Sequence, residues 1–301
     1  MKSKGMIYTI LSAVLFGIAP LLAMKVYALG GTPTTVVFLR SFLIIPILYI
    51  LMKKDKEVMR VERYELKNIV MIAIFGSGLT TIMLFTSYQY IDVGTATTLH
   101  FLYPIFVAVL CVVVYHEVLD KYKTLALIIA IAGILCFIDF NNHGSVLGLF
   151  LALASSITYA FYMVELEKKK LTRMNPYKLS LYIAIFVALE TIVYSIFVPS
   201  LTLVLPPIAY LYIFLIAICT SFLGVVLLQK GIAYLGSTTA SIFCLFEPIT
   251  SIVTGVLFLN EKLTFIKVLG CVIILSAVVL LVYANKRRSL ELEKLNNQIN
   301  D

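Results

Sequence analysis

The stretch SIFCLFEPITSIVTGVLFL, from Ser241 to Leu259, carries a single charged residue, Glu247, and a proline directly after it. This apolar run is long enough to cross a lipid bilayer, which takes about 20 residues as a helix. A charge in the middle of a membrane helix costs about 2.5–3.5 kcal/mol on insertion scales, so it normally faces a protein interior or a cavity. Pro248 cannot donate to the carbonyl of Cys244 and its ring clashes there, so the pattern predicts a kink beside the carboxylate.

The rest of the chain has the same apolar character. Of its 301 residues, 61% are hydrophobic and 13% are charged, which is about half the charged fraction of a typical soluble protein. Ten apolar stretches, most of them separated by short gaps, cover roughly residues 6–28, 34–52, 68–90, 95–115, 122–139, 146–166, 177–198, 208–230, 237–259 and 265–284. We therefore predict an all-α integral membrane protein with ten transmembrane helices.

The formal net charge of +8 reflects the orientation in the membrane rather than nucleic-acid binding. With the N-terminus in the cytoplasm and ten crossings, the basic clusters all fall on the cytoplasmic side, at residues 2–4, 53–67, 121–123, 168–178 and 286–294. The opposite loops hold only Lys25, Lys262 and Lys267. This positive-inside bias predicts a multi-pass protein of the cell membrane with both termini in the cytoplasm. The polar tail 286–301 forms a short helix or stays disordered, and of the two a frayed, solvated end is favoured.

An internal repeat supports the division into spans. Residues 90–123 match residues 234–267 without gaps, at an offset of 144. Three of the identities are rarely produced by apolar composition alone: Pro104/Pro248, Glu117/Glu261 and Lys123/Lys267. We interpret the chain as two five-helix repeats, residues 1–139 and 140–285. Because five is odd, the second repeat enters the membrane from the opposite side, an architecture typical of secondary transporters with a midplane site between the repeats.

A family pattern appears in both repeats. The second contains YLGSTTASIFCLFEPITSIVTGVLFLNEKL, from Tyr234 to Leu263, and the first has FLYPIFVAVLCVVVYHEVL in the same frame, with Tyr103 at the position of Glu247. These motifs, VFLRSFLIIP around Arg40, and Phe16-Gly17 in place of the more usual Trp-Gly resemble the EamA-type carriers of the drug/metabolite transporter superfamily. The resemblance covers residues 5–284. It implies two inverted five-helix repeats around a cavity lined chiefly by spans 1–4 and 6–9, and it favours export.

Two glutamates are candidates for substrate binding or coupling. Burial favours the neutral carboxylic acid of Glu247, which suits a group that exchanges a proton during transport. The alternative is a structural glutamate bound to carbonyls that the kink at Pro248 releases. Glu190 stands near the middle of span 7, where it lines the cavity or pairs with a basic group. Glu117 and Glu261 end spans 4 and 9, and we interpret them as structural residues tied to loop amides or to Lys123 and Lys267.

Three further residues at membrane depth complete the candidate site. Arg40 in span 2 attracts an anionic substrate, pairs with Glu190 or Glu247, or extends its guanidinium to the membrane surface. His100 and Tyr103 stand beside the kink predicted at Pro104 in span 4, as cavity residues or as packing residues.

The sequence argues against an enzyme. It lacks the motifs GxxxxGK[ST], HExxH and GxSxG. His100 and His116 are sixteen residues apart on one helix, about 24 Å, too far to share a metal. We therefore expect no catalytic residue, metal or cofactor.

The hypothesis is a secondary transporter that moves a small polar metabolite, an amino acid or a related compound, across the cell membrane by alternating access. Proton exchange and facilitated diffusion both stay open as its driving force. The expected partners are the small-molecule substrate and the lipid bilayer, without nucleic acid, in a monomer or a dimer. The alternatives are a lipid or cationic-drug transporter of the same fold and, less favoured, a membrane-embedded enzyme or receptor.

Overall fold

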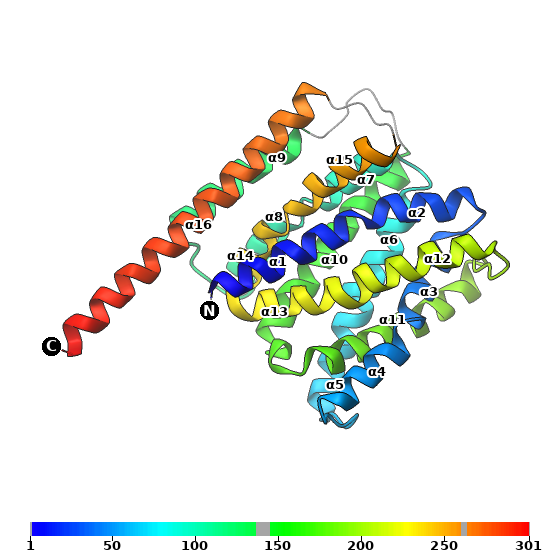
Figure 1. The fold of residues 1–301 in the computed structure, drawn as a ribbon, viewed down its shortest axis with the longest axis horizontal. Helices are drawn as coiled ribbons and strands as arrows, with labels where there is room; N and C mark the ends of the chain where they lie inside the picture. Colours follow the sequence, from blue (N-terminus) through cyan, green and yellow to red (C-terminus); the bar gives the residue numbers. More distant parts are fainter. Residues whose placement is uncertain (1, 137–144, 260–263, 301) are drawn as a thin grey trace.

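A computed structural model describes residues 2–136, 145–259 and 264–300 of the chain. Within those ranges the protein is a bundle of long helices and contains no β-strand (Figure 1). Eight helical stretches are long and apolar enough to span a membrane: Lys2–Ala28, Pro33–Lys54, Arg63–Ser87, Val93–Val113, Val146–Lys168, Pro176–Phe197, Pro207–Leu235 and Ser237–Phe258. They correspond to the predicted spans 1–4 and 6–9, so the prediction of a multi-pass, all-α membrane protein is confirmed.

The helices of the first half are α1 (Lys2–Gly17), α2 (Ala19–Ala28), α3 (Pro33–Phe42), α4 (Ile45–Lys54), α5 (Arg63–Met71), the π-helix η1 (Ile72–Gly78), α6 (Leu79–Ser87), α7 (Val93–His100), α8 (Tyr103–Val113) and α9 (Lys121–Leu135). Those of the second half are α10 (Val146–Lys168), the 3₁₀ helix η2 (Leu171–Arg173), α11 (Pro176–Phe197), α12 (Pro207–Ile216), the π-helix η3 (Ala217–Gly224), α13 (Val225–Leu235), α14 (Ser237–Phe243), α15 (Phe246–Leu259) and α16 (Phe265–Asn300). Helices α9 and α16 lie at the predicted spans 5 and 10, whose membrane crossing stays a prediction.

Four of the described spans are interrupted, and a proline follows each interruption. The breaks separate α1 from α2, α3 from α4, α7 from α8 and α14 from α15. The prolines that follow them within three residues are Pro20, Pro46, Pro104 and Pro248. In the first turn of a helix a proline replaces an N–H that has no intrahelical partner, whereas further along it removes a hydrogen bond. The sequence therefore starts a new helical segment at each of these prolines.

The third span of each half contains a π-helical segment. Segment η1 has the sequence IAIFGSG and η3 has AICTSFLG, and both continue directly into an α-helix on either side. Such segments are rare in proteins and frequent at functional sites. They occupy matching places in the two halves, as do the breaks before Tyr103 and Phe246. This correspondence is what a duplicated chain would produce.

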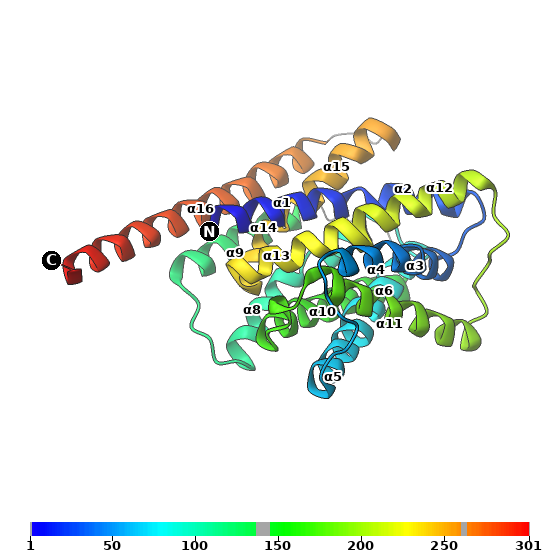
Figure 2. The same cartoon turned by 60° about the horizontal axis from the view of Figure 1, so that its bottom comes forward.

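The two halves also pack on each other in a reciprocal manner. Helix α1 packs along α13 and η3 of the second half, and α10 packs along α6 and η1 of the first half. Helices α9 and α16 lie side by side at one edge of the bundle (Figures 1 and 2). Helix α16 continues to Asn300, where we expected a frayed tail, because its last residues are rich in the good helix formers Leu, Glu and Lys.

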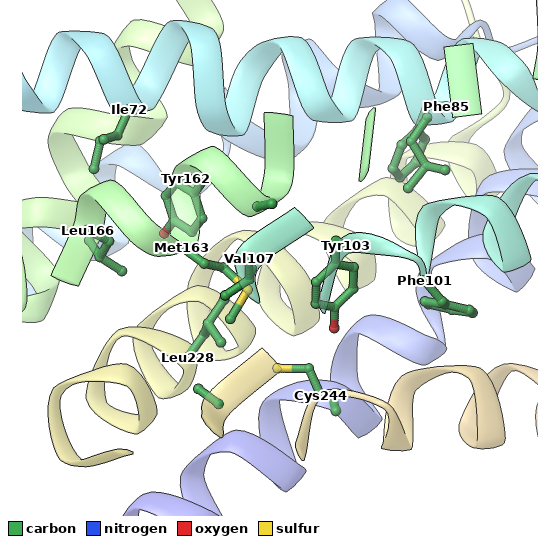
Figure 3. Packing of buried hydrophobic residues seen from close by; sticks show 14 of the residues in the cluster. Ile72, Phe85, Phe101, Tyr103, Val107, Tyr162, Met163, Leu166, Leu228 and Cys244 are labelled. Atoms are coloured by element: carbon green, nitrogen blue, oxygen red, sulfur yellow. The ribbon is translucent and has the colours of Figure 1, made fainter. Parts of the chain in front are cut away.

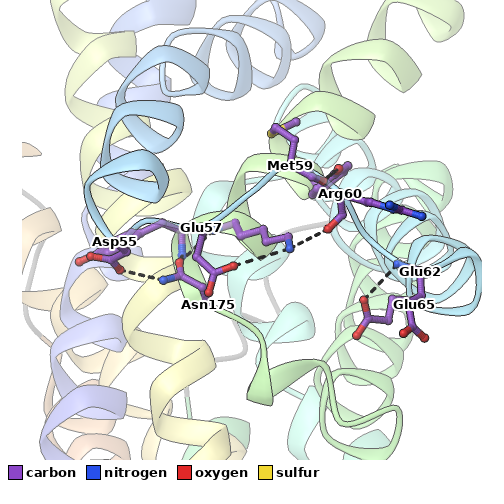
Figure 4. A network of polar contacts seen from close by, with 10 residues as sticks. Asp55, Glu57, Met59, Arg60, Glu62, Glu65 and Asn175 are labelled. Carbon is purple, nitrogen blue, oxygen red and sulfur yellow. Dashed lines mark hydrogen bonds and ion pairs between the residues drawn. The ribbon is translucent and has the colours of Figure 1, made fainter.

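The loop between α4 and α5 is tied to the start of α11 by polar contacts (Figure 4). Asn175 donates from Nδ2 to the Asp55 carboxylate at 2.7 Å. Lys178 donates to the Arg60 carbonyl at 2.9 Å and lies 3.7 Å from the Glu57 carboxylate. Spans 2 and 7 are therefore held together at the end of the bundle that the positive-inside bias assigns to the cytoplasm.

A second polar contact at the same end of the bundle corrects an expectation. Glu117 forms an ion pair with Lys168 at the end of α10, rather than with Lys123. The backbone N–H of Glu117 donates to the Cys111 carbonyl at 2.9 Å, so the chain folds back after α8 and directs the carboxylate toward α10. Glu261, its counterpart in the second repeat, lies outside the described residues.

Candidate functional site

A cavity of about 380 Å³, here called the vestibule, lies between α2, α7 and α15. Two residues of its lining, Asp92 and Gly94, are exposed, so the vestibule communicates with the surface. Its lining from span 1 comes from α2, the half that is remote from the N-terminus. The vestibule therefore opens at the end of the bundle opposite the N-terminus.

A smaller cavity of about 50 Å³, here called the chamber, continues the vestibule into the bundle. The two cavities share four lining residues: Pro20, Tyr88, Thr97 and Phe101. Deeper in the chamber the lining includes three of the residues that the sequence singles out, Arg40, His100 and Glu247. The structure thus gathers a cation, an imidazole and a carboxylate from spans 2, 4 and 9 around one space.

Glu247 stands in the first turn of α15, where the start of the helix favours a negative charge. Its backbone N–H donates to the Cys244 carbonyl at 2.9 Å. The carbonyl that the kink releases therefore accepts from the backbone of Glu247. The side chain is half-buried and lines the chamber, and it forms no ion pair with a described residue.

Gly17, in the Phe16-Gly17 pair, brings the end of α1 against the backbone of Glu247. A Cβ atom at Gly17 would lie 2.6 Å from the Cβ of Thr250 and 2.7 Å from the Glu247 carbonyl oxygen. Both distances are shorter than any real Cβ contact, and one of them is to main chain. Only glycine therefore allows spans 1 and 9 to approach this closely beside the chamber.

Gly17→Ala should lower the thermal stability of the purified protein, because overpacking of a tight contact costs about 1–3 kcal/mol. The measurement is the midpoint of thermal unfolding in detergent. Gly94→Ala is the matched control, since a Cβ atom there meets no atom within 4 Å. Equal midpoints for the two variants would contradict the close approach.

Arg40, in α3, is 6% exposed and so does not extend to the membrane surface. Its Nη1 lies 3.5 Å from the Thr220 hydroxyl oxygen, and its guanidinium carbon is 5.3 Å from the centroid of the Phe85 ring. Its Nε has no hydrogen-bond partner. No carboxylate oxygen of a described residue lies within 4.0 Å of its nitrogens, so the ion pair considered with Glu190 or Glu247 is not formed.

His100, at the end of α7, is 4% exposed and its Nδ1 lies 2.9 Å from the Ser155 hydroxyl oxygen. Ser155 donates its own proton to the Ala152 carbonyl at 2.6 Å, so we assign Nδ1 as the donor in the contact with His100. In the neutral imidazole Nε2 is then an acceptor. The ring lies among aromatic neighbours, 5.3 Å from Tyr159 and 5.5 Å from Tyr103 between centroids.

Tyr103 is fully buried and does not line the chamber. Its ring packs edge-on against Tyr159 at 4.8 Å, and its hydroxyl points toward Cys244, at the break of span 9 (Figure 3). Tyr103, in the first turn of α8, therefore points at the break of span 9. Glu247, in the first turn of α15, instead lines the chamber. The repeat predicts equivalent positions along the two spans, and the structure gives them different surroundings.

Glu190, in α11, lies apart from the other candidates. It lines neither the vestibule nor the chamber, and its Oε2 is buried without a hydrogen-bond partner. The carboxylate rests against Gly78 of η1, where a Cβ atom would lie 1.7 Å from Oε2. The structure thus places Glu190 at a π-helical segment.

Gly78→Ala should lower the thermal stability less than Gly17→Ala does, because the added methyl group displaces only the flexible end of the Glu190 side chain. In a Glu190→Ala background the same change should cost much less, which gives a coupling of about 0.5–3 kcal/mol between the two positions. A double-mutant cycle of unfolding midpoints in detergent measures the coupling. Strictly additive effects would show that the carboxylate does not depend on Gly78.

Tyr88 and Thr97 line the chamber but are not among the five candidate site residues. Tyr88 stands at the outer end of span 3, a position typical of an interfacial anchor, yet it is 7% exposed. Thr97 precedes His100 and Phe101 by three and four residues, so the three side chains share a face of α7. The spacing of Thr97 from His100 in the sequence could therefore have identified Thr97 as a candidate site residue.

The chain matches the model of the EamA-like transporter family twice, over residues 3–138 and 146–283, and it belongs to that family. The resemblance drawn from the residues is thereby confirmed. An uncharacterized transporter of Synechocystis sp. is 28% identical over 207 residues, which are 67% of this chain and 62% of that relative. An uncharacterized transporter of Archaeoglobus fulgidus is 25% identical over 225 residues, which are 74% of this chain and 80% of that relative.

The fold recurs in a solved structure. A protein known from its crystal structure superimposes with a TM-score of 0.71 at 14% sequence identity, over 95% of this chain and 99% of that one. At this identity the likeness establishes the fold and no more.

Proposed function

We propose that this protein is a secondary transporter that moves a zwitterionic metabolite, an amino acid or a related compound, across the cell membrane by alternating access. Its membership of a transporter family supports transport rather than catalysis. The orientation with both termini in the cytoplasm rests on the positive-inside bias. Export is the direction that the family resemblance favours.

The observation that carries the proposal is the pair of unpaired charges in the chamber. Arg40 and Glu247 line the same space without forming an ion pair with each other. A guanidinium binds a carboxylate through two parallel hydrogen bonds, and a carboxylate accepts from an ammonium group. A substrate that carries both groups satisfies both side chains at once.

The sizes of the two cavities fit a small substrate with a variable part. The chamber, at about 50 Å³, has room for the charged head group, and the vestibule, at about 380 Å³, can hold the side chain. The aromatic residues Phe85, Phe101 and Tyr159 supply apolar surface around the charges. Small-molecule sites combine such surfaces with a few placed polar groups.

Alternating access is supported by the difference between the two ends of the bundle. The vestibule communicates with the surface at one end. At the other end α1 packs tightly along α13, and a Cβ atom at Gly5 would lie 2.6 Å from the Cβ of Tyr234. The reciprocal packing of the two halves suits a motion in which one end opens as the other closes, as in carriers with inverted repeats.

Counterflow in liposomes that contain the purified protein tests the proposal. Liposomes preloaded with unlabelled amino acids should accumulate labelled amino acid, while analogues that lack either the carboxylate or the amine should compete at least about tenfold more weakly, the loss of one charge-assisted hydrogen bond. Cationic drugs and a fluorescent lipid complete the panel. The proposal is wrong if a cation without a carboxylate, or the lipid, is transported while amino acids are not.

A further inference from the structure

A third cavity shares Arg40 with the chamber as a lining residue. It has a volume of about 20 Å³, and we call it the serine pocket because Ser41, Ser77, Ser180 and Ser221 all line it, from spans 2, 3, 7 and 8. Among the described lining residues, Arg40 alone belongs to both the chamber and the serine pocket. The rest of the pocket wall is aliphatic, so its polar groups are the guanidinium and the four hydroxyls.

Two polar groups of the serine pocket have no partner. Nε of Arg40 and the hydroxyl of Ser221 are buried without a hydrogen bond, and these residues are only 6% and 8% exposed. The Ser180 hydroxyl oxygen accepts from Gln229 Nε2 at 3.1 Å, so its proton remains available to the pocket. A buried donor left without an acceptor destabilises a protein by about 1–3 kcal/mol, and more when it is charged.

The charge of Arg40 is also uncompensated in the serine pocket. No carboxylate lines the serine pocket, and none of a described residue lies within 4.0 Å of the guanidinium. A buried charge is normally paired, because desolvation without a counter-ion is strongly unfavourable. Glu247 lines the chamber and not the serine pocket.

We propose that the serine pocket binds a small inorganic anion of the size of chloride, as the counter-ion of Arg40. The anion accepts hydrogen bonds from Arg40 Nε, from the unpartnered hydroxyl of Ser221 and from the hydroxyl of Ser180. The volume suits one particle of about the size of a water molecule. It is too small for sulfate or phosphate. A bound anion holds the guanidinium in place at the floor of the chamber.

Thermal unfolding of the purified full chain in detergent tests the binding without any transport substrate. The unfolding midpoint should rise saturably when sodium chloride replaces sodium gluconate at constant ionic strength. Ser221→Ala should raise the half-saturating chloride concentration about tenfold, the loss of one hydrogen bond to a charged group. Ser195→Ala is the matched control, since its exposed hydroxyl donates to the Ile192 carbonyl of its own helix.

A chloride response that is absent, or that is equal in the Ser221→Ala variant and the parent, would overturn the proposal. Crystals of the parent grown in bromide give a second measurement that needs no variant. An anomalous peak between Ser221 and Arg40 is the expected result. Bromide peaks confined to the protein surface would identify the ion as adventitious only.

Discussion

Arg40→Met should weaken substrate binding about 10- to 100-fold, because a hydrogen bond to a charged group contributes about 1.5–3 kcal/mol and the variant removes the cation from the chamber. Arg40→Lys should give an intermediate loss, since an ammonium keeps the charge but not the planar fork that binds a carboxylate through two bonds. The measurement is the concentration of unlabelled substrate that halves counterflow in liposomes. Variants are compared at equal amounts of protein that elutes as a single species.

The control for Arg40 is Arg60→Met, which removes an exposed arginine side chain outside the three cavities. It should keep the affinity of the parent. If Arg40→Met also keeps that affinity, the guanidinium does not bind the substrate. The charges of Arg40 and Glu247 would then no longer support the proposal that the substrate is a zwitterion.

Glu247→Gln should abolish the response of transport to an imposed pH gradient, because an amide of the same shape cannot take up or release a proton. Exchange at saturating substrate and without a gradient should continue. The affinity should fall about tenfold or more, since the amide loses a charge-assisted hydrogen bond to the substrate's ammonium group. Uptake of labelled substrate into liposomes, with and without a pH difference, separates the two effects.

Glu190→Gln is the matched control, the same substitution at a carboxylate that lies outside the chamber. It should leave both the pH response and the affinity as in the parent. If Glu190→Gln abolishes the response to the pH gradient and Glu247→Gln retains it, the proton coupling depends on Glu190 and not on Glu247. If the parent itself ignores the gradient, the protein works by facilitated diffusion or exchange.

The eight spans and the breaks beside Pro104 and Pro248 could be predicted from the sequence, because both depend on local properties. Length and hydropathy mark a membrane helix, and a proline in the interior of a helix interrupts it. The breaks that precede α2 and α4 were not predicted. The π-helical segments η1 and η3 were not predicted, since a run of small and apolar residues is equally compatible with an α-helix. Which winding such a run adopts depends on its neighbours: Gly78 of η1 meets Glu190, and Gly224 of η3 meets Phe16.

The composition of the site was harder to predict, because depth along a helix does not determine which way a side chain faces. Arg40, His100 and Glu247 meet in the chamber, whereas Tyr103 packs behind it and Glu190 lies against η1. All five are predicted to lie within membrane spans. Their surroundings depend on how each helix is rotated about its own axis relative to its neighbours. That rotation cannot be predicted from a single sequence with one internal repeat.

The contact of Gly17 with the main chain of Glu247 has a mechanical meaning. Two backbones that touch without intervening side chains can pivot about the point of contact, but they cannot slide past each other without a collision. We therefore expect span 1 and the first turn of α15 to move together. A tilt of span 1 should then displace Glu247, and with it the negative charge in the chamber.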